Sequence, residues 1–179
     1  MIVDLADEVA YISHDIDDGI EHGLISFEEL TESTLVSRVM ALVAAEKIPV
    51  RSDLYRFRFT GRFIAEMVND ILSNSKVITG PVPANEPKPI RFSQETREAL
   101  SSLKRLLKKR LYRHATVMER MYSGKVCIRN LFDAMQEEPH ILPESVRRQQ
   151  ERRSPNRVVA DYIASLSDRS AMELYRRLF

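Results

Sequence analysis

The sequence predicts an all-α protein, and three observations support that fold class. Apolar residues recur at helical spacing in nearly every segment, for example at Leu35, Val39 and Val43. The chain of 179 residues has only five glycines and no tryptophan, which suits helices better than a sandwich or a barrel. Four of its eight prolines fall within residues 74–89, a stretch that cannot be helical and that separates helical segments. We therefore expect a multi-helix bundle.

Serines and prolines set the expected helix boundaries. Ser26, Ser52 and Ser93 each precede an apolar pattern and are expected N-caps. The next expected helix, from about residue 112 to residue 136, is either continuous with the helix at 93–111 or broken near Gly124. The expected helices span residues 4–20, 27–30, 34–47, 52–73, 93–111, 112–136, 143–150, 157–166 and 168–178. The proline-rich stretch contains at most a short extended piece at 77–79.

The helix expected at 52–73 has apolar residues throughout its length. Its apolar pattern comprises the following positions: Leu54, Phe57, Ile64, Met67, Val68 and Ile71. Together with the proline-rich stretch, these patterns predict three parts: a core segment at 1–73, a connector at 74–92 and a helical domain at 93–179.

Composition limits the class of protein. With 44% hydrophobic and 30% charged residues, the chain has the balance of an ordinary soluble globular protein. The single Cys127 lies among apolar neighbours and is expected in the core, which excludes a disulfide framework and a multi-cysteine zinc site. No run of about 18 apolar residues occurs, and residues 1–11 lack signal-peptide features. We expect no membrane association and a cytoplasmic location.

The formal net charge of +1 hides a strong separation of charge along the chain. Residues 1–37 contain ten Asp and Glu and no Lys or Arg, whereas the other 142 residues contain 27 basic and 16 acidic side chains. Separation of this kind predicts that the two parts attract each other or that each meets its own charged partner.

Most of the acidic residues within the first expected helix gather on one side of it. At about 100° per residue, Asp7, Tyr11 and Asp15 fall within about 80° of one another. An apolar stripe that includes Ile12 and Ile16 lies on the other side. This face is either an ordinary solvated surface or a surface covered by a cation, a metal ion or a basic partner. Carboxylates favour hard divalent ions such as Mg or Mn, but one helix cannot complete a site for them.

Residues Asp4 to Gly19 resemble the late active-site helix of bacterial dGTPase-like triphosphohydrolases of the HD type. The resemblance implies that Asp7 is the last ligand of a divalent metal, Mn or Mg. It also implies that Tyr11 and Asp15 contact the 3′-hydroxyl of the deoxyribose. His14 and Asp15 spell the letters of the HD doublet, but by the family pattern they are not the metal-binding pair.

Further motifs extend the resemblance along the chain. Residues 62–70 resemble the helix that follows the family's active-site region, and 103–143 resemble the phosphohydrolase-associated helical domain. Segments 158–169 and 174–179 resemble the family's closing region. The implied reaction converts a dNTP and water to a deoxynucleoside and triphosphate. The family enzymes oligomerise, so a homo-oligomer is also expected.

The histidines of the HD signature have no counterpart before Asp4. The catalytic set is therefore expected to be incomplete in this chain, and the chain on its own is expected to be inactive and to hold no metal. Cations must bind the triphosphate tail of a substrate. The candidates are Arg56, Arg58 and Arg62, among which Arg58 and Arg62 are preferred.

Two alternatives from other functional classes stay open. One is a basic helical module that binds nucleic acid, because 104–113 and 147–157 are rich in Lys and Arg, although no DNA-reading motif accompanies them. The other is an accessory or oligomerisation subunit, which the apolar end formed by Tyr175, Leu178 and Phe179 would favour.

Overall fold

The computed structural model describes residues 2–76 and 89–179, and every regular element in this part of the chain is a helix. The predicted all-α fold class is thus confirmed. The chain divides into two compact units, Met1–His114 and Ala115–Phe179, each with its own apolar core. No helix among the described residues combines the length and apolar composition that crossing a membrane requires.

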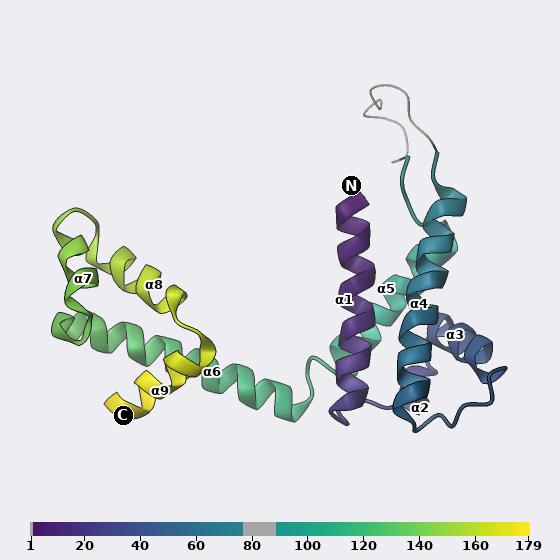
Figure 1. Cartoon of the computed structure of the whole chain (residues 1–179), viewed down its shortest axis with the longest axis horizontal. Helices are drawn as coiled ribbons and strands as arrows, with labels where there is room; N and C mark the ends of the chain where they lie inside the picture. Colours follow the sequence, from purple (N-terminus) through teal and green to yellow (C-terminus); the bar gives the residue numbers. More distant parts are fainter. Residues whose placement is uncertain (1, 77–88) are drawn as a thin grey trace. The chain divides into compact units, whose positions relative to one another are not determined.

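The first unit is built around two long helices that pack side by side, α1 and α4 (Figure 1). Its helices are α1 (Ile2–Glu21), α2 (Phe27–Leu30), α3 (Thr34–Ala44), α4 (Asp53–Asn74) and α5 (Gln94–Arg110). Ile12 and Ile16 of α1 and Phe59, Phe63 and Met67 of α4 are almost completely buried. The core of this unit therefore fixes how α1 is rotated about its axis.

The helix starts in the first unit are where the serines predicted them. Ser26 forms a capping box: its hydroxyl accepts from the backbone N–H of Glu29, whose carboxylate accepts from the N–H of Ser26. The hydroxyls of Ser52 and Ser93 each cap their helix by accepting one hydrogen bond, from the backbone N–H of Tyr55 and of Thr96 respectively. The expected end of the third helix at residue 47 was wrong, because α3 ends at Ala44 and Lys47 adopts a left-handed backbone with φ 55°.

The apolar pattern predicted for α4 mixed two faces of the helix. The buried face consists of Tyr55, Phe59, Phe63 and Met67, which follow one another at four-residue steps. Leu54, Phe57 and Val68 point outward and are 56%, 58% and 43% exposed. Because α4 is apolar on more than one side, helical spacing alone could not identify the side that is buried.

The second unit contains α6 (Ala115–Glu137), α7 (Glu144–Arg147), α8 (Pro155–Ser165) and α9 (Asp168–Leu178), with 3-10 turns at Pro139–Ile141 and Arg148–Glu151. Helix α6 runs without a break through Gly124 and is separated from α5 by a four-residue turn. The core of the second unit includes Leu131, Met135, Val159 and Cys127, so the predicted burial of the cysteine is confirmed. Burial also raises the pKa of the Cys127 thiol.

The predicted three-part division of the chain stays a prediction. In the structure α5 belongs to the same compact unit as α1 and α4, although its sequence was assigned to the helical domain at 93–179. The short extended piece expected at 77–79 lies outside the described residues.

Candidate active-site face

Asp7, Tyr11 and Asp15 occupy successive turns on one side of α1, as four-residue spacing requires. We call these three residues the candidate face. Asp7 is exposed, Tyr11 is 59% exposed and Asp15 is half-buried. The structure thus places all three on a single uninterrupted helix, where one ligand could contact them together.

Tyr112 reaches the candidate face from beyond the end of α5. Its hydroxyl donates a hydrogen bond to Oδ2 of Asp15, and its ring centroid lies 6.4 Å from that of Tyr11. Burial raises the pKa of Tyr112, and the hydrogen bond to Asp15 raises it further, because both favour the protonated phenol. Tyr112 therefore holds the Asp15 carboxylate in one orientation beside the Tyr11 ring.

Sequence reasoning missed Tyr112 because it lies 97 residues from Asp15 and was expected to begin the helix at 112–136, whereas the structure places it in the turn between α5 and α6. The one signal is its neighbour Leu111, a buried residue directly after the basic end of α5. Leu111 lies against Gly19 of α1, where an added methyl group would be 3.0 Å from the Leu111 side chain. The absence of a side chain at Gly19 lets the chain approach α1 closely enough for Tyr112 to reach Asp15.

A second contact joins α5 to the polar side of α1. Nζ of Lys104 lies 2.5 Å from Oε1 of Glu8, which directly follows Asp7 in the helix. A pocket of about 730 Å³ opens beside Glu8 and is also lined by Arg91 and Arg97. This arrangement places three basic side chains beside Glu8, the residue that follows Asp7 in α1.

The arginines predicted to bind phosphate lie on α4. Arg58 pairs with Glu46 at 2.9 Å, and Arg62 pairs with Glu66 at 3.4 Å. Both arginines are about half exposed. The structure does not bring either of them into contact with Asp7, Tyr11 or Asp15 among the interactions of the described residues.

Arg56, the third arginine considered, is buried between α1 and α4. Its Nη1 lies 2.6 Å from Asp17 and 3.2 Å from Glu21, and the Thr60 hydroxyl donates to Asp17 at 3.1 Å. Only 8% of the Arg56 side chain is exposed. It therefore fastens the end of α1 to α4 and has no room for a phosphate.

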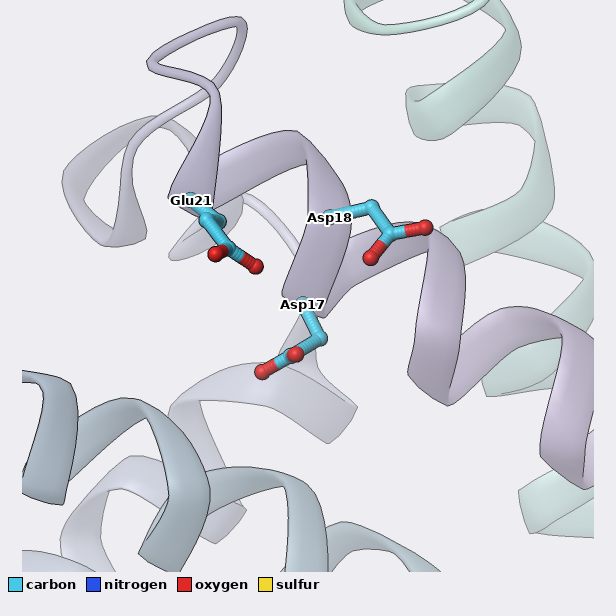
Figure 2. Close-up of side chains that lie close together, drawn as sticks. All are labelled: Asp17, Asp18 and Glu21. Atoms are coloured by element: carbon cyan, nitrogen blue, oxygen red, sulfur yellow. The ribbon is translucent and has the colours of Figure 1, made fainter.

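The last turns of α1 carry three close carboxylates, those of Asp17, Asp18 and Glu21 (Figure 2). Their oxygen atoms are near enough to one another for a metal ion, but Asp17 and Glu21 already form ion pairs with Arg56. In residues 2–76 and 89–179, Asp7 belongs to no group of three potential ligands. The described residues therefore do not form a metal site around Asp7.

The acidic start and the basic remainder of the chain do attract each other. Glu8 pairs with Lys104 and Asp17 pairs with Arg56, as described above. In addition, Arg110 of α5 pairs with Glu32 at 2.7 Å and lies 3.9 Å from Glu29. These contacts confirm the first of the two explanations for the charge separation.

Comparison with known proteins agrees with this arrangement of motifs. Residues 90–177 match the family described as "Phosphohydrolase-associated domain". A relative from Wolinella succinogenes, named deoxyguanosinetriphosphate triphosphohydrolase-like protein, is 41% identical over 187 residues, which is 99% of this chain and 51% of the relative. Relatives of the same name from Caulobacter sp. strain K31 and Bordetella pertussis are each 34% identical and are covered to 47% and 48% of their length.

The chain thus spans about half the length of the curated relatives that it matches, while nearly all of the chain is included in the match. The matches cover both compact units, and the candidate face lies within them. Residues 90–177 thus resemble the phosphohydrolase-associated domain, and the whole chain is similar to about half of the proteins named deoxyguanosinetriphosphate triphosphohydrolase-like.

Proposed function

We propose that this chain contributes the sugar-binding arm of a dNTP triphosphohydrolase, which converts a dNTP and water to a deoxynucleoside and triphosphate. The observation that carries the proposal is the joint placement of Tyr11, Asp15 and Tyr112, with Asp15 held by a hydrogen bond. A fixed carboxylate beside an exposed aromatic ring can accept a hydrogen bond from a sugar hydroxyl while the ring packs against the sugar.

In this proposal Asp7 supplies one ligand of a divalent ion, Mn or Mg, in the intact enzyme. The other ligands must come from outside the described residues, because Asp7 belongs to no potential metal group among them. A single carboxylate cannot fix such an ion. We therefore expect the chain on its own to release no triphosphate.

The triphosphate tail requires cations near the candidate face. Arg58 and Arg62 can serve only if they leave Glu46 and Glu66, which is a small cost because both pairs are half exposed. The pocket beside Glu8 offers Arg91 and Arg97 without such a rearrangement of α4. We favour this pocket for the tail.

The test joins this chain to the half of the Wolinella succinogenes relative that it does not match, and follows inorganic triphosphate released from dGTP. The joined protein should be active with Mn or Mg, and the chain alone should not. Asp7→Asn should reduce the joined activity by at least about 100-fold, since a metal ligand is lost.

Asp133→Asn is the matched control, because Asp133 is an exposed acid on α6, away from the candidate face in the sequence. Its effect should be less than about threefold, as expected for a surface substitution. Release of triphosphate by the 179-residue chain without the added half would overturn the claim of inactivity. Equal loss in both variants would refute the role of Asp7.

A further inference from the structure

An apolar groove of about 330 Å³ lies between α1 and α4. The α1 wall is formed by Ala6, Ala10 and His14, which follow one another at four-residue steps. Two of these side chains are single methyl groups, so the backbone of α1 is accessible to a neighbouring helix at close range. The groove is therefore shaped for a close helix contact.

The α4 wall of the groove is apolar and open to solvent. Ile64, Val68 and Leu72 follow one another at four-residue steps, and Val68 and Leu72 are 43% and 69% exposed. Exposed apolar side chains that are contiguous on one face mark a surface that another element covers. Two of these residues, Ile64 and Val68, belong to the apolar pattern expected for this helix from the sequence.

The groove adjoins the candidate face along its length. Ala6, Ala10 and His14 each directly precede one of the three residues of that face, so the two strips lie about 100° apart around α1. Anything that fills the groove thus lies beside the candidate carboxylates and is well placed to bring further polar side chains to them.

We propose that the groove binds an apolar helix face from the half of the family relatives that this chain does not match. That half exists, because the relatives are about twice as long as the matched region. This inference rests on the proposed function in one respect, namely that the candidate face needs groups from outside the described residues. The occupant fills the groove and so places those groups beside Asp7.

The experiment coexpresses the tagged 179-residue chain with the unmatched half of the Wolinella succinogenes relative, whose matched half is 41% identical to this chain. Copurification and sedimentation velocity measure the complex. We expect a 1:1 complex, and Val68→Asp should weaken it at least tenfold. Ala6→Trp, which adds apolar bulk without a charge, should weaken it to a similar extent.

Leu42→Asp on α3 is the matched control, because Leu42 is 39% exposed, close to the 43% of Val68, and lies outside the groove. It should leave the complex unchanged. Circular dichroism melting of each variant checks that the chain still folds. A complex that is insensitive to Val68→Asp and Ala6→Trp, or no complex at all, overturns the inference.

Self-association of the 179-residue chain that Val68→Asp abolishes would also overturn it, because a second copy would then be the occupant. Triphosphate release by the complex is measured separately. A groove-dependent complex that shows no hydrolysis leaves this inference standing and refutes the proposed function. Hydrolysis by a complex whose formation is unaffected by the groove variants would refute this inference and leave the proposed function standing.

Discussion

Tyr112 links burial to the geometry of Asp15, and its titration offers a direct measure of that link. Its pKa is raised in the folded chain, chiefly by burial and then by the hydrogen bond to Asp15. In the unfolded chain a tyrosine ionises near pH 10. The contribution of the protonated Tyr112 hydroxyl to the free energy of unfolding is therefore fully present below about pH 10 and is lost as the pH rises above that value.

Urea unfolding at pH 8 and pH 10.5 should show this loss. The free energy of unfolding of the native chain should fall more between the two pH values than that of the Tyr112→Phe variant, because phenylalanine at this position has no hydroxyl to ionise. Tyr122→Phe serves as the control, because Tyr122 is 69% exposed. Parallel behaviour of the native chain and Tyr112→Phe would contradict the assignment.

Gly19 is the second residue whose chemistry has a sharp consequence. A methyl group there would lie 3.0 Å from side-chain atoms of both Ile25 and Leu111. Gly19→Ala should lower the free energy of unfolding by about 1–3 kcal/mol, as overpacking does. It should also displace Tyr112 from Asp15, which the change in tyrosine absorbance between pH 8 and 10.5 would report.

Gly61→Ala is the matched control, since Gly61 is also helical but a methyl group there meets nothing within 4 Å. This change should stabilise the chain by roughly 0.5–1 kcal/mol, because alanine favours a helix over glycine. Thermal melts of the two variants should thus move in opposite directions. A stabilised Gly19→Ala would show that the contact with Leu111 is loose.

At the scale of elements, Arg56 fastens α1 to α4. Its buried guanidinium bridges Asp17 and Glu21, whereas Arg58 on the same helix makes a more exposed pair with Glu46. Arg56→Ala should cost about 1–3 kcal/mol, less than a fully buried pair because Glu21 is half exposed and can be hydrated. Arg58→Ala should cost about 0–1 kcal/mol.

Chemical denaturation with matched variants measures both costs. If Arg56→Ala and Arg58→Ala lowered the free energy of unfolding by equal, small amounts, apolar packing alone would set the position of α1. Because α1 carries the candidate face, an Arg56 variant should also reduce the activity of the joined protein more than an Arg58 variant of equal stability would.

The elements also show what sequence could and could not predict. Helix starts were predictable because a capping serine acts within three residues, as at Ser26 and Ser52. The alignment of Asp7, Tyr11 and Asp15 was predictable for a similar reason, since it depends only on helical spacing. The contact of Tyr112 with Asp15 and the burial of Arg56 were not, because both depend on which helix faces pack together.

At the scale of the whole molecule, the separation of charge is almost neutralised inside the first unit. Residues 1–37 carry ten acids, and residues 38–114 carry 16 basic and seven acidic side chains. Several of these opposite charges pair directly, as Lys104 does with Glu8 and Arg110 with Glu32. Residues 115–179 carry 11 basic and nine acidic side chains, so neither unit has a large net charge.

This balance predicts weak binding to nucleic acid, in spite of the basic runs at 104–113 and 147–157. Affinity for a phosphate backbone grows with the number of phosphates that free cations neutralise, and paired cations release fewer counterions. The chain should leave a heparin or duplex DNA column by about 0.15 M salt, where the Debye length is about 8 Å. Glu8→Gln should raise the eluting salt concentration slightly, because Lys104 then loses its partner. Retention of the native chain beyond about 0.5 M salt, with a steep dependence of binding on salt, would instead favour the nucleic-acid module.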